Sequence, residues 1–306
     1  MSFGRLEMSE RHSSTFYDPR PQPYYAHVNG QWQEVPGFSP TPRHSYSTIK
    51  LLSWNIDFQA PNAEQRMRAA LQYLCSLVAT FEVPTVIFLQ EMVSSDLAEI
   101  RSTPWIQTSY YVTDLSTRNW LSLYGTTTLV DRRLHMSSVL RTRYNSNMGR
   151  DALFVDLENK SEAVLRLCNT HLESLQAAPP LRPGQVALVS RALHDPVVDA
   201  GVVSGDFNAI EGFDLTLHAE NGLRDAYLEN GGEDPNEDGW TWGMQTDRNP
   251  YGCQRLDKML FCGQVVVQNL ERIGAGVQVE HGAGEGAGQF VTDHLGLMAD
   301  LVLEQA

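Results

Sequence analysis

The chain has few cysteines, no long apolar segment and a shortage of basic residues. Its four cysteines form no C-x-x-C pair, so reduced thiols in a reducing compartment are expected. No apolar run approaches the ~20 residues needed to cross a bilayer, and the first residues, MSFGRLEMSERHSS, include no apolar signal segment. We therefore expect a protein without a membrane span that acts inside the cell, in the nucleus, the cytoplasm or both.

Basic residues are outnumbered, with 23 Lys and Arg against 37 Asp and Glu and a formal net charge of −14. Extensive binding to a phosphate backbone generally requires a basic surface, so the composition argues against it. A protein that acts on the ends of nucleic acids needs only a local basic groove. One cluster of arginines is available for it, and a solvated surface is the equal alternative: Arg132, Arg133, Arg141, Arg143 and Arg150.

The length of 306 residues, with 42% hydrophobic and 20% charged residues, allows one large domain or two small ones. Residues 1–47 are rich in Pro, Ser, Tyr and His and predict an N-terminal arm. Within the arm, Asn29-Gly30 lies between two alternating runs and predicts a packed β-hairpin over 24–35. A Gly-rich stretch, 274–288, predicts a mobile loop that leads into the last polar motif.

From residue 48 onward, segments typical of strands and helices alternate. Apolar periodicity predicts helices over 65–79 and 183–193, and Ser95 is expected to cap a further helix. Apolar, β-branched and aromatic runs predict strands over 49–54, 86–89, 106–112, 126–130, 153–157, 164–168, 202–203, 259–261, 265–267 and 297–303. Runs of adjacent strands with few helices favour an α+β fold in which sheets pack face to face.

Six short polar motifs recur at the ends of the apolar runs: S-W-N-I-D, L-Q-E, N-T-H-L-E, S-G-D-F-N, R-L-D and T-D-H. A single Asp or Asn in such a place is usually a turn former, but six ordered sites together hold the groups needed to cleave a phosphate ester with a divalent cation. Oxygen ligands of the kind that Mg²⁺ prefers are supplied by Asn55, Asp57, Glu91 and Asp293. Deprotonating a water and holding the pentavalent phosphorus are tasks that suit Asp206, Asn208, His171 and His294.

In chain order, S-W-N-I-D, F-L-Q-E, T-H-L-E-S, G-D-F-N, R-L-D and T-D-H-L-G-L resemble the motif series of the endonuclease/exonuclease/phosphatase superfamily of metal-dependent phosphodiesterases. The resemblance spans residues 50–300. Within the superfamily, T-H-L-E-S, M-G-R-D and T-W-G-M-Q-T are similar to the 5′-tyrosyl-DNA phosphodiesterases. The resemblance implies a DNase I-like, four-layer αββα sandwich, with one catalytic domain over 48–306 and motif loops that converge at one edge.

The resemblance also implies a cofactor and a partner. Glu91 is expected to be the principal ligand of Mg²⁺, for which Mn²⁺ substitutes, and Asn55, Asp57 and Asp293 complete or support the shell. The implied partner is the 5′ end of DNA that carries a covalent tyrosyl adduct. A monomer is expected.

Catalytic roles follow from the same resemblance. Asp206 is expected to orient or deprotonate the attacking water, and Asn208 to hold that water or a phosphoryl oxygen. His171 and His294 are expected to donate to the negative charge that develops on the phosphate. Asp257 is expected to fix the orientation and protonation of His294.

Two further residues are expected to contact substrate, each with a structural alternative. Trp242 offers a flat surface for a leaving-group ring or a terminal base, or else anchors a packed loop. Arg255 binds phosphate, or else bridges buried carboxylates. The arginines typical of the tyrosyl-DNA branch are replaced by Leu175-Gln176 and Ala209-Ile210. A related nuclease or phosphatase acting on abasic DNA, a lipid or a small molecule, and a catalytically retired binding protein, therefore stay as alternatives.

Overall fold

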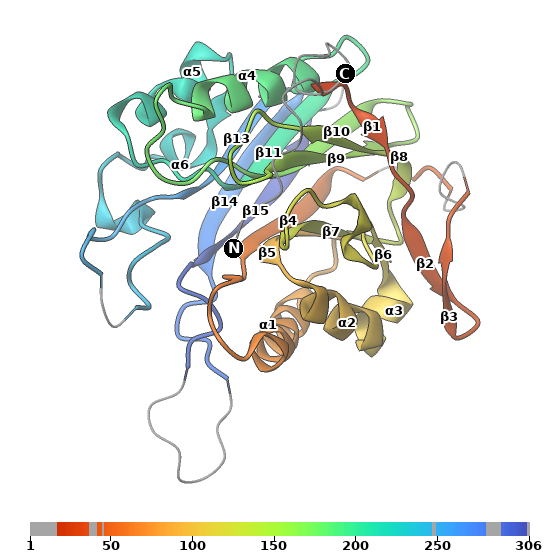
Figure 1. Cartoon of the computed structure of the whole chain (residues 1–306). Coiled ribbons are helices and arrows are strands. Elements are labelled where there is room, and N and C mark those ends of the chain that lie inside the picture. The colour runs from red at the N-terminus through yellow and green to blue at the C-terminus, as the bar shows by residue number, and fades with distance from the viewer. Residues whose placement is uncertain (1–16, 37–41, 45, 247–248, 280–288, 305–306) are drawn as a thin grey trace, which may run out of the picture.

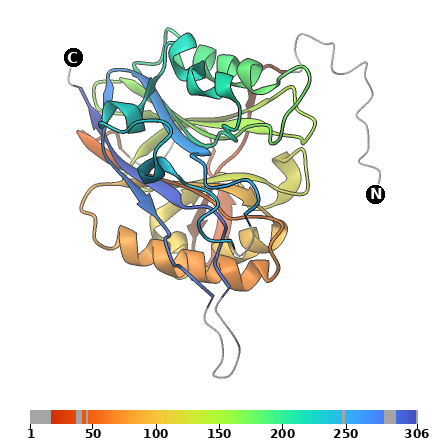
Figure 2. The same cartoon turned by 90° about the vertical axis from the view of Figure 1, so that its left-hand side faces the viewer.

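Two β-sheets pack face to face, and helices cover their outer faces (Figure 1). The computed structural model describes residues 17–36, 42–44, 46–246, 249–279 and 289–304. No helix in these ranges is long and apolar enough to cross a membrane. The predicted four-layer αββα sandwich is confirmed, and Figure 2 shows the same layers from the side.

Sheet A contains seven strands among the described residues, and β10 and β11 are its parallel pair. In spatial order its strands are β1 (Arg20–Pro21), β8 (His135–Arg143), β9 (Asp151–Glu158), β10 (Val164–His171), β11 (Ala200–Asp206), β13 (Asp257–Gly263) and β12 (Arg224–Asp225). Its outer face is covered by α4 (Arg182–Leu193) and α5 (Leu217–Glu220), while α6 (Ala226–Glu229) lies beside β13. Three short 3₁₀ segments occur at Thr117–Asn119, Gly212–Leu215 and Glu237–Gly239.

Sheet B contains eight described strands, and β4 and β5 are its parallel pair. In spatial order they are β14 (Val265–Ile273), β15 (Gly296–Leu303), β4 (Thr48–Asn55), β5 (Thr85–Met92), β7 (Gly125–Asp131), β6 (Tyr110–Val112), β2 (Tyr25–Val28) and β3 (Gln31–Glu34). Its outer face is covered by α1 (Ala63–Val78), α2 (Ser94–Ser102) and α3 (Pro104–Ser109).

The strands are apolar on both faces because each sheet lies between two cores. Successive strand residues point to opposite sides, so in β4 Leu51 packs between the sheets and Leu52 packs under α1. In β10, Leu167 likewise faces the inter-sheet core and Cys168 faces the layer of α4. Burial on both faces explains why these strands appear in the sequence as continuous apolar runs rather than as alternating patterns.

The two parallel pairs position the site. In each pair the carboxyl ends of the strands meet at the same sheet edge, and β4 and β5 contact β11 and β10 across the inter-sheet core. The last residues of three of these strands, Asn55, His171 and Asp206, therefore reach a common edge of the sandwich. Four of the six polar motifs lie at this edge because β4, β5, β10 and β11 end there, whereas R-L-D and T-D-H lie where β13 and β15 begin.

The Asn29-Gly30 signal corresponds to the turn between β2 and β3. Both residues have positive φ, 50° and 81°, as a type I′ hairpin turn requires. The hairpin extends sheet B, since Tyr25 pairs with Val112 of β6. The arm therefore contributes strands to the sandwich. Other parts of the arm, and residues 280–288 of the expected mobile loop, lie outside the described residues.

Two local predictions are wrong, and one strand was missed. The strand expected over 106–112 is limited to β6, because Pro104 occupies the start of a short helix. Ser95 does not cap α2, which begins at Ser94 and is capped by the Asp96 carboxylate accepting from Val93 N at 2.7 Å. Strand β8 was not predicted, because its residues, HMSSVLRTR, are mainly polar although most of them are at least half-buried.

A buried pair of amides joins the two sheets. Gln90 of β5 donates through Nε2 to Asn169 Oδ1 of β10 at 2.8 Å, and both side chains are fully buried. Asn169 Nδ2 donates in turn to the carbonyl oxygens of Thr127 at 3.0 Å and Leu89 at 3.3 Å. Buried polar groups are costly unless they are paired, so this bridge fixes how β5 and β10 face one another.

We predict that Asn169→Leu lowers the free energy of unfolding by about 1–3 kcal/mol, because it removes one of the two acceptors of the buried Gln90 amide, the other being Ser53 Oγ, and also the side-chain donor to the carbonyls of Thr127 and Leu89. Urea unfolding measures the change. The matched control is Gln268→Ala, which removes an exposed amide from β14 and should change stability by less than ~0.5 kcal/mol. Unfolding of Asn169→Leu at the wild-type midpoint would show that the bridge does not hold the sheets.

Candidate active site

Side chains from distant stretches of the chain meet at the edge where the parallel strands end. Asn55, His171 and Asp206 terminate β4, β10 and β11, Glu91 lies near the end of β5, and His294 lies two residues before β15. The contacts among them, given below, join five of the six polar motifs. The structure therefore brings together the residues that the sequence predicts as the centre of the site.

Asp206 is the hub of the cluster. Its Oδ2 accepts from Asn55 Nδ2 at 3.0 Å, and it lies 3.3 Å from His171 Nε2 and 3.8 Å from His294 Nε2. Its Oδ1 accepts from the backbone N of Asn208 at 2.8 Å. The side chain is 2% exposed. Asp206 Oδ2 thus faces two imidazoles, while Oδ1 is hydrogen-bonded to the backbone of the residues that follow Asp206.

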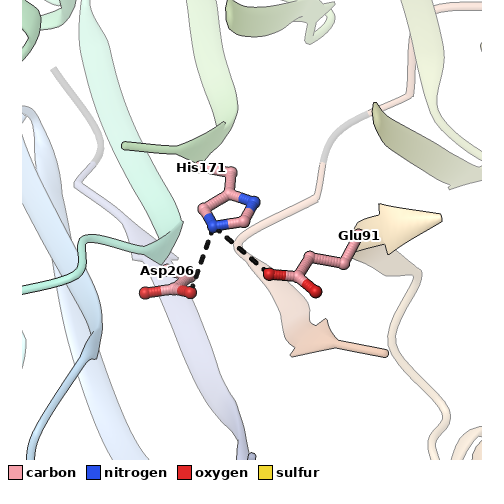
Figure 3. A group of neighbouring side chains, drawn as sticks. All are labelled: Glu91, His171 and Asp206. Carbon is pink, nitrogen blue, oxygen red and sulfur yellow. Dashed lines mark ion pairs between the residues drawn. The ribbon is translucent and has the colours of Figure 1, made fainter. Parts of the chain in front are cut away.

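Glu91, His171 and Asp206 form a compact group of potential ligands (Figure 3). His171 lies between the two acids, with its Nε2 also 3.6 Å from Glu91 Oε1. One ligand atom from each of the three residues lies within 4.8 Å of the others. Such a donor set suits a divalent cation. Of the three, Glu91 belongs to the predicted ligand set, whereas His171 and Asp206 were predicted to take part in catalysis.

The sequence predicted a strand over 86–89 with Glu91 past its end, but the structure places Glu91 inside β5. The pairing of β5 with β7 shifts register between Leu89 and Met92, and Glu91 has a φ of 58°. A bulge of this kind redirects a side chain, and here it allows Glu91 Oε2 to accept from Phe58 N at 3.0 Å. Burial raises the pKa of the Glu91 carboxyl, and the nearby Arg150 opposes the rise.

Asp57 lies in a tight turn next to the cluster. Its φ is 58°, its backbone N donates to Asn55 Oδ1 at 2.9 Å, and its Oδ1 accepts from the backbone N of Gln59 at 2.9 Å. Burial, followed by the negative charges of Asp293 and Glu91, raises the pKa of Asp57. The three carboxylates therefore repel one another, an arrangement that a bound cation would relieve.

Arg66 of α1 binds the backbone of this turn, a role that was not predicted from the sequence. Its guanidinium is 1% exposed and donates only to backbone carbonyls. The acceptors are Ile56 at 2.5 Å, Asp57 at 2.7 Å, Val291 at 2.7 Å, Pro61 at 2.9 Å and Ala60 at 2.9 Å. One side chain of α1 thereby joins the Asp57 turn to the segment that leads to Asp293.

His294 and Asp257 form a buried ion pair, as predicted. His294 Nδ1 lies 2.8 Å from Asp257 Oδ2, which leaves Nε2 directed toward Asp206. Burial alone would lower the pKa of His294, but Asp257 and Asp206 together raise it well above its usual value. Burial raises the pKa of Asp257 to about 6 despite the attraction of His294. The pair therefore presents a donor at His294 Nε2.

The two residues expected to contact substrate both make contacts within the protein. Trp242 Nε1 donates to Asp293 Oδ2 at 2.6 Å. Arg255 donates through Nη2 to Asp225 Oδ2 at 2.9 Å and through Nε to Asp234 Oδ1 at 2.9 Å, and it is 9% exposed. The structure favours the structural alternative for Arg255, because its donors are used in pairs with two carboxylates.

Arg150 and an aromatic wall were not assigned to the site from the sequence. The Arg150 guanidinium contacts the ring nitrogens of His171 and lies over the Tyr124 ring, 4.9 Å from its centroid. Tyr124 stacks on Phe58 with centroids 3.9 Å apart. The motif M-G-R-D was the part of the sequence that could have pointed to Arg150. Its Gly149 has a φ of 71°, and a Cβ at that position would contact Leu121 O.

Three arginines of the cluster, Arg132, Arg133 and Arg141, are engaged by partners within the protein. Arg141 is buried and pairs with Asp114 at 3.0 Å and Asp151 at 2.8 Å. Arg133 pairs with Asp131 at 2.6 Å, and Arg132 donates to the carbonyl of His27 at 3.0 Å. These donors are used to hold the fold together.

The chain matches known proteins over most of its length. Residues 52–294 match the model of the "Endonuclease/Exonuclease/phosphatase family". Tyrosyl-DNA phosphodiesterase 2 of Rattus norvegicus is 26% identical over 286 residues, which cover 86% of this chain and 69% of the rat protein. The structure of truncated Caenorhabditis elegans TDP2 superposes with a TM-score of 0.65 and 22% identity, over 83% of this chain and 97% of the other. The structure of D. rerio TDP2 complexed with single-strand DNA product gives a TM-score of 0.64 and 20% identity, over 84% and 99%.

The family model extends from β4 to His294 and so includes all six polar motifs. The solved structures share the sandwich fold with this chain. Fold, motif order and clustered side chains agree, and the chain belongs to the endonuclease/exonuclease/phosphatase family.

Proposed function

We propose that this protein is a Mg²⁺-dependent phosphodiesterase that hydrolyses 5′-phosphotyrosyl, or related 5′-end, phosphodiester bonds of DNA by direct attack of water. The observation that carries the proposal is the placement of Asp206 between two imidazoles and within ligand distance of Glu91. The similarity to the rat tyrosyl-DNA phosphodiesterase supports the choice of substrate. We also propose that the enzyme acts as a monomer.

The donor set fits a hard cation held by Glu91, with Asp57, Asp293 and Asn55 as further oxygen donors beside it. Burial, followed by the negative charges of Asp293 and Glu91, raises the pKa of Asp57, and a cation there would relieve both effects. When bound, Mg²⁺ or Mn²⁺ would polarise the phosphoryl oxygens and neutralise the charge of the transition state. The side chains described next supply the proton transfers and the orientation of substrate.

Asp206 is the proposed general base. Its Oδ2 is a buried acceptor at the centre of the cluster, and Asn55 fixes its orientation through the 3.0 Å hydrogen bond. Asn208 has a φ of 48° and donates through Nδ2 to Leu172 O at 3.2 Å, which leaves its Oδ1 as an acceptor for the same water. A base in hydrogen-bond reach of its water is the geometric requirement for this step.

His294 and His171 are the proposed donors to the phosphoryl oxygens. His294 Nδ1 is engaged by Asp257, so Nε2 carries the proton that faces the cluster. A preorganised donor of this kind stabilises charge that develops in the transition state without reorganisation. The other imidazole, His171, has the positively charged guanidinium of Arg150 beside its ring nitrogens.

The leaving group is a phenolate if the substrate is a tyrosyl adduct. Arg150 lies beside His171 and over Tyr124, so a cation and an aromatic face border the scissile bond together. A planar guanidinium stabilises a delocalised oxyanion, and an aromatic wall accepts its ring. Phe58 supports that wall by stacking on Tyr124.

One observation favours a second candidate, a phosphoesterase of the same family that acts on abasic DNA, a lipid or a small molecule. Leu175 and Ile210 are 67% and 37% exposed, and they lie in the two stretches from which the arginines typical of the tyrosyl-DNA branch are missing. A retired binding protein is not favoured, because the site keeps mutually repelling acids that serve no purpose without a cation.

A substrate panel tests the proposal. We expect purified protein with Mg²⁺ to hydrolyse a 5′-phosphotyrosyl oligonucleotide in preference to an abasic duplex and a generic aryl phosphodiester, and to lose activity when EDTA removes the metal. Asp206→Asn should reduce kcat by at least ~10²-fold, since it removes the base. Asp18→Asn, which changes an exposed carboxylate, is the control and should leave kcat unchanged. Faster hydrolysis of either other substrate would assign the site to the second candidate.

Arg150 is predicted to act on the leaving group. Arg150→Lys keeps the charge but loses the planar fork, so its loss of kcat/KM should grow with the basicity of the leaving phenol. Thymidine 5′-phosphodiesters of phenol and of 4-nitrophenol provide the comparison, and the phenyl ester should suffer the larger loss. Equal losses for both esters would place Arg150 on the phosphate or in packing alone.

The protonation of His294 gives a pH prediction for the metal-free protein. Asp257 and Asp206 favour the imidazolium and burial opposes it, so wild-type His294 should stay protonated at neutral pH. In Asp257→Asn the opposing effect of burial remains while the closest carboxylate is removed, and the pKa of His294 should fall. An NMR titration with ¹³C-labelled histidine, assigned by the signal lost in His294→Gln, measures both values. An unchanged pKa in Asp257→Asn would contradict the assigned pairing.

A further inference from the structure

Three repelling carboxylates of the site each have one oxygen held by a neutral N–H group. Glu91 Oε2 accepts from Phe58 N at 3.0 Å, and Asp57 Oδ1 accepts from backbone amides of its own turn. Asp293 Oδ2 accepts from Trp242 Nε1 at 2.6 Å. Among these described contacts, the indole is the one side-chain donor, so it is the one that a substitution can remove.

The backbone of Trp242 is held from both sides. Its N and O pair with Gln254 at 3.0 and 3.1 Å, and it forms an antiparallel bridge with His294. Gly243 follows with a φ of 92°, and a Cβ there would meet Asn249 and the carbonyl oxygen of Gly252. The indole therefore has a fixed base from which to reach Asp293.

The rest of T-W-G-M-Q-T holds the neighbours of Asp293. The carbonyl of Thr241 accepts from Leu295 N at 2.6 Å, and Gln245 Nε2 donates to Thr292 O at 3.2 Å. Thr241 Oγ1 also accepts from Asp257 N at 2.9 Å. One short segment thus contacts residues 292, 293 and 295 as well as the partner of His294. This pattern of contacts explains the motif as a brace for the Asp293-His294 loop.

We propose that Trp242 is a positioning residue, whose indole N–H fixes Asp293 Oδ2 and so orients Asp293 Oδ1 toward the cation site. Asp293 Oδ1 lies 3.9 Å from His294 Nε2, on the side of the cluster. The side chain of Asp293 is 32% exposed, so without the indole it is free to turn toward solvent. The proposal rests on the proposed function, because it assigns a cation to Asp293.

Trp242→Phe separates this role from substrate stacking, because it keeps an aromatic ring and removes the N–H. We expect Mn²⁺, measured by electron paramagnetic resonance on the full chain without substrate, to bind ~10-fold more weakly, as loss of a ligand-orienting hydrogen bond typically causes. We also expect kcat to fall while KM for the oligonucleotide stays unchanged. A stacking role instead predicts wild-type Mn²⁺ affinity in Trp242→Phe.

Trp32→Phe is the matched control. Trp32 Nε1 donates to Arg101 O at 3.1 Å on the N-terminal hairpin, so the variant also loses an indole hydrogen bond, but one remote from the site. Trp32→Phe should bind Mn²⁺ as the wild type does. If both variants lose thermal stability equally and only Trp242→Phe loses metal affinity, a general folding defect is excluded.

A double variant completes the test. In the Asp293→Ala background, Trp242→Phe should cause no further loss of Mn²⁺ affinity, because the oxygen that accepts from the indole is already gone. A full additional loss would show that Trp242 acts elsewhere, and would overturn the proposal. Wild-type protein that binds Mn²⁺ but cleaves no member of the substrate panel would refute the proposed function alone. Wild-type protein that binds no Mn²⁺ would overturn both.

Discussion

The spacing between the two sheet edges is the constraint on which the site depends. Asn55 and Glu91 come from sheet B, whereas His171 and Asp206 come from sheet A. The contacts of Asn55 with Asp206 and of Glu91 with His171 therefore cross from one sheet to the other. An apolar core alone sets such a spacing loosely, because apolar contacts have no direction. The paired amides of Gln90 and Asn169 add direction, one residue before Glu91 and two before His171 along their strands. The cluster is therefore built upon a hydrogen bond that no ligand takes part in.

A second constraint is the concentration of negative charge at this edge. Raised pKa values for Asp57 and Glu91 show that the folded protein bears a free-energy cost to hold ionised acids there. Asp57, Glu91 and Asn208 also have positive φ, a conformation that non-glycine residues adopt only when their surroundings enforce it. Arg66 supplies part of that enforcement by binding the carbonyls around Asp57. The local backbone and charge arrangement therefore lowers the stability of the folded protein, and it fixes the positions of the oxygen atoms at the site.

The sequence was sufficient for what is local and for what repeats across motifs. The apolar runs predicted most strands, and the resemblance of the polar motifs to a known family implied that the loops with Asn55 and Asp206 converge at one edge. It was insufficient where tertiary contacts decide. The bulge at Glu91 arises from the pairing of β5 with β7, and the contact of Arg150 with His171 arises from a loop whose path no periodicity reveals. Trp242 acts as a hydrogen-bond donor and not as a stacking surface because its Nε1 meets Asp293, which lies 51 residues away in the sequence.

The way the chain uses its arginines bears on how substrate is recognised. Arg66, Arg141, Arg182 and Arg255 are all at most 9% exposed, so their charges stabilise loops and ion pairs instead of attracting phosphates. With a net charge of −14, a long polyanion that approached the surface would meet repulsion that counterion release does not offset. Affinity for the proposed substrate must then come from the scissile phosphate and the groups next to it. The cation site, Arg150 and the stacked ring of Tyr124 are located where such short-range binding is possible. An enzyme that grips only the end of a strand does not need a basic groove, which reconciles the acidic composition with a DNA substrate.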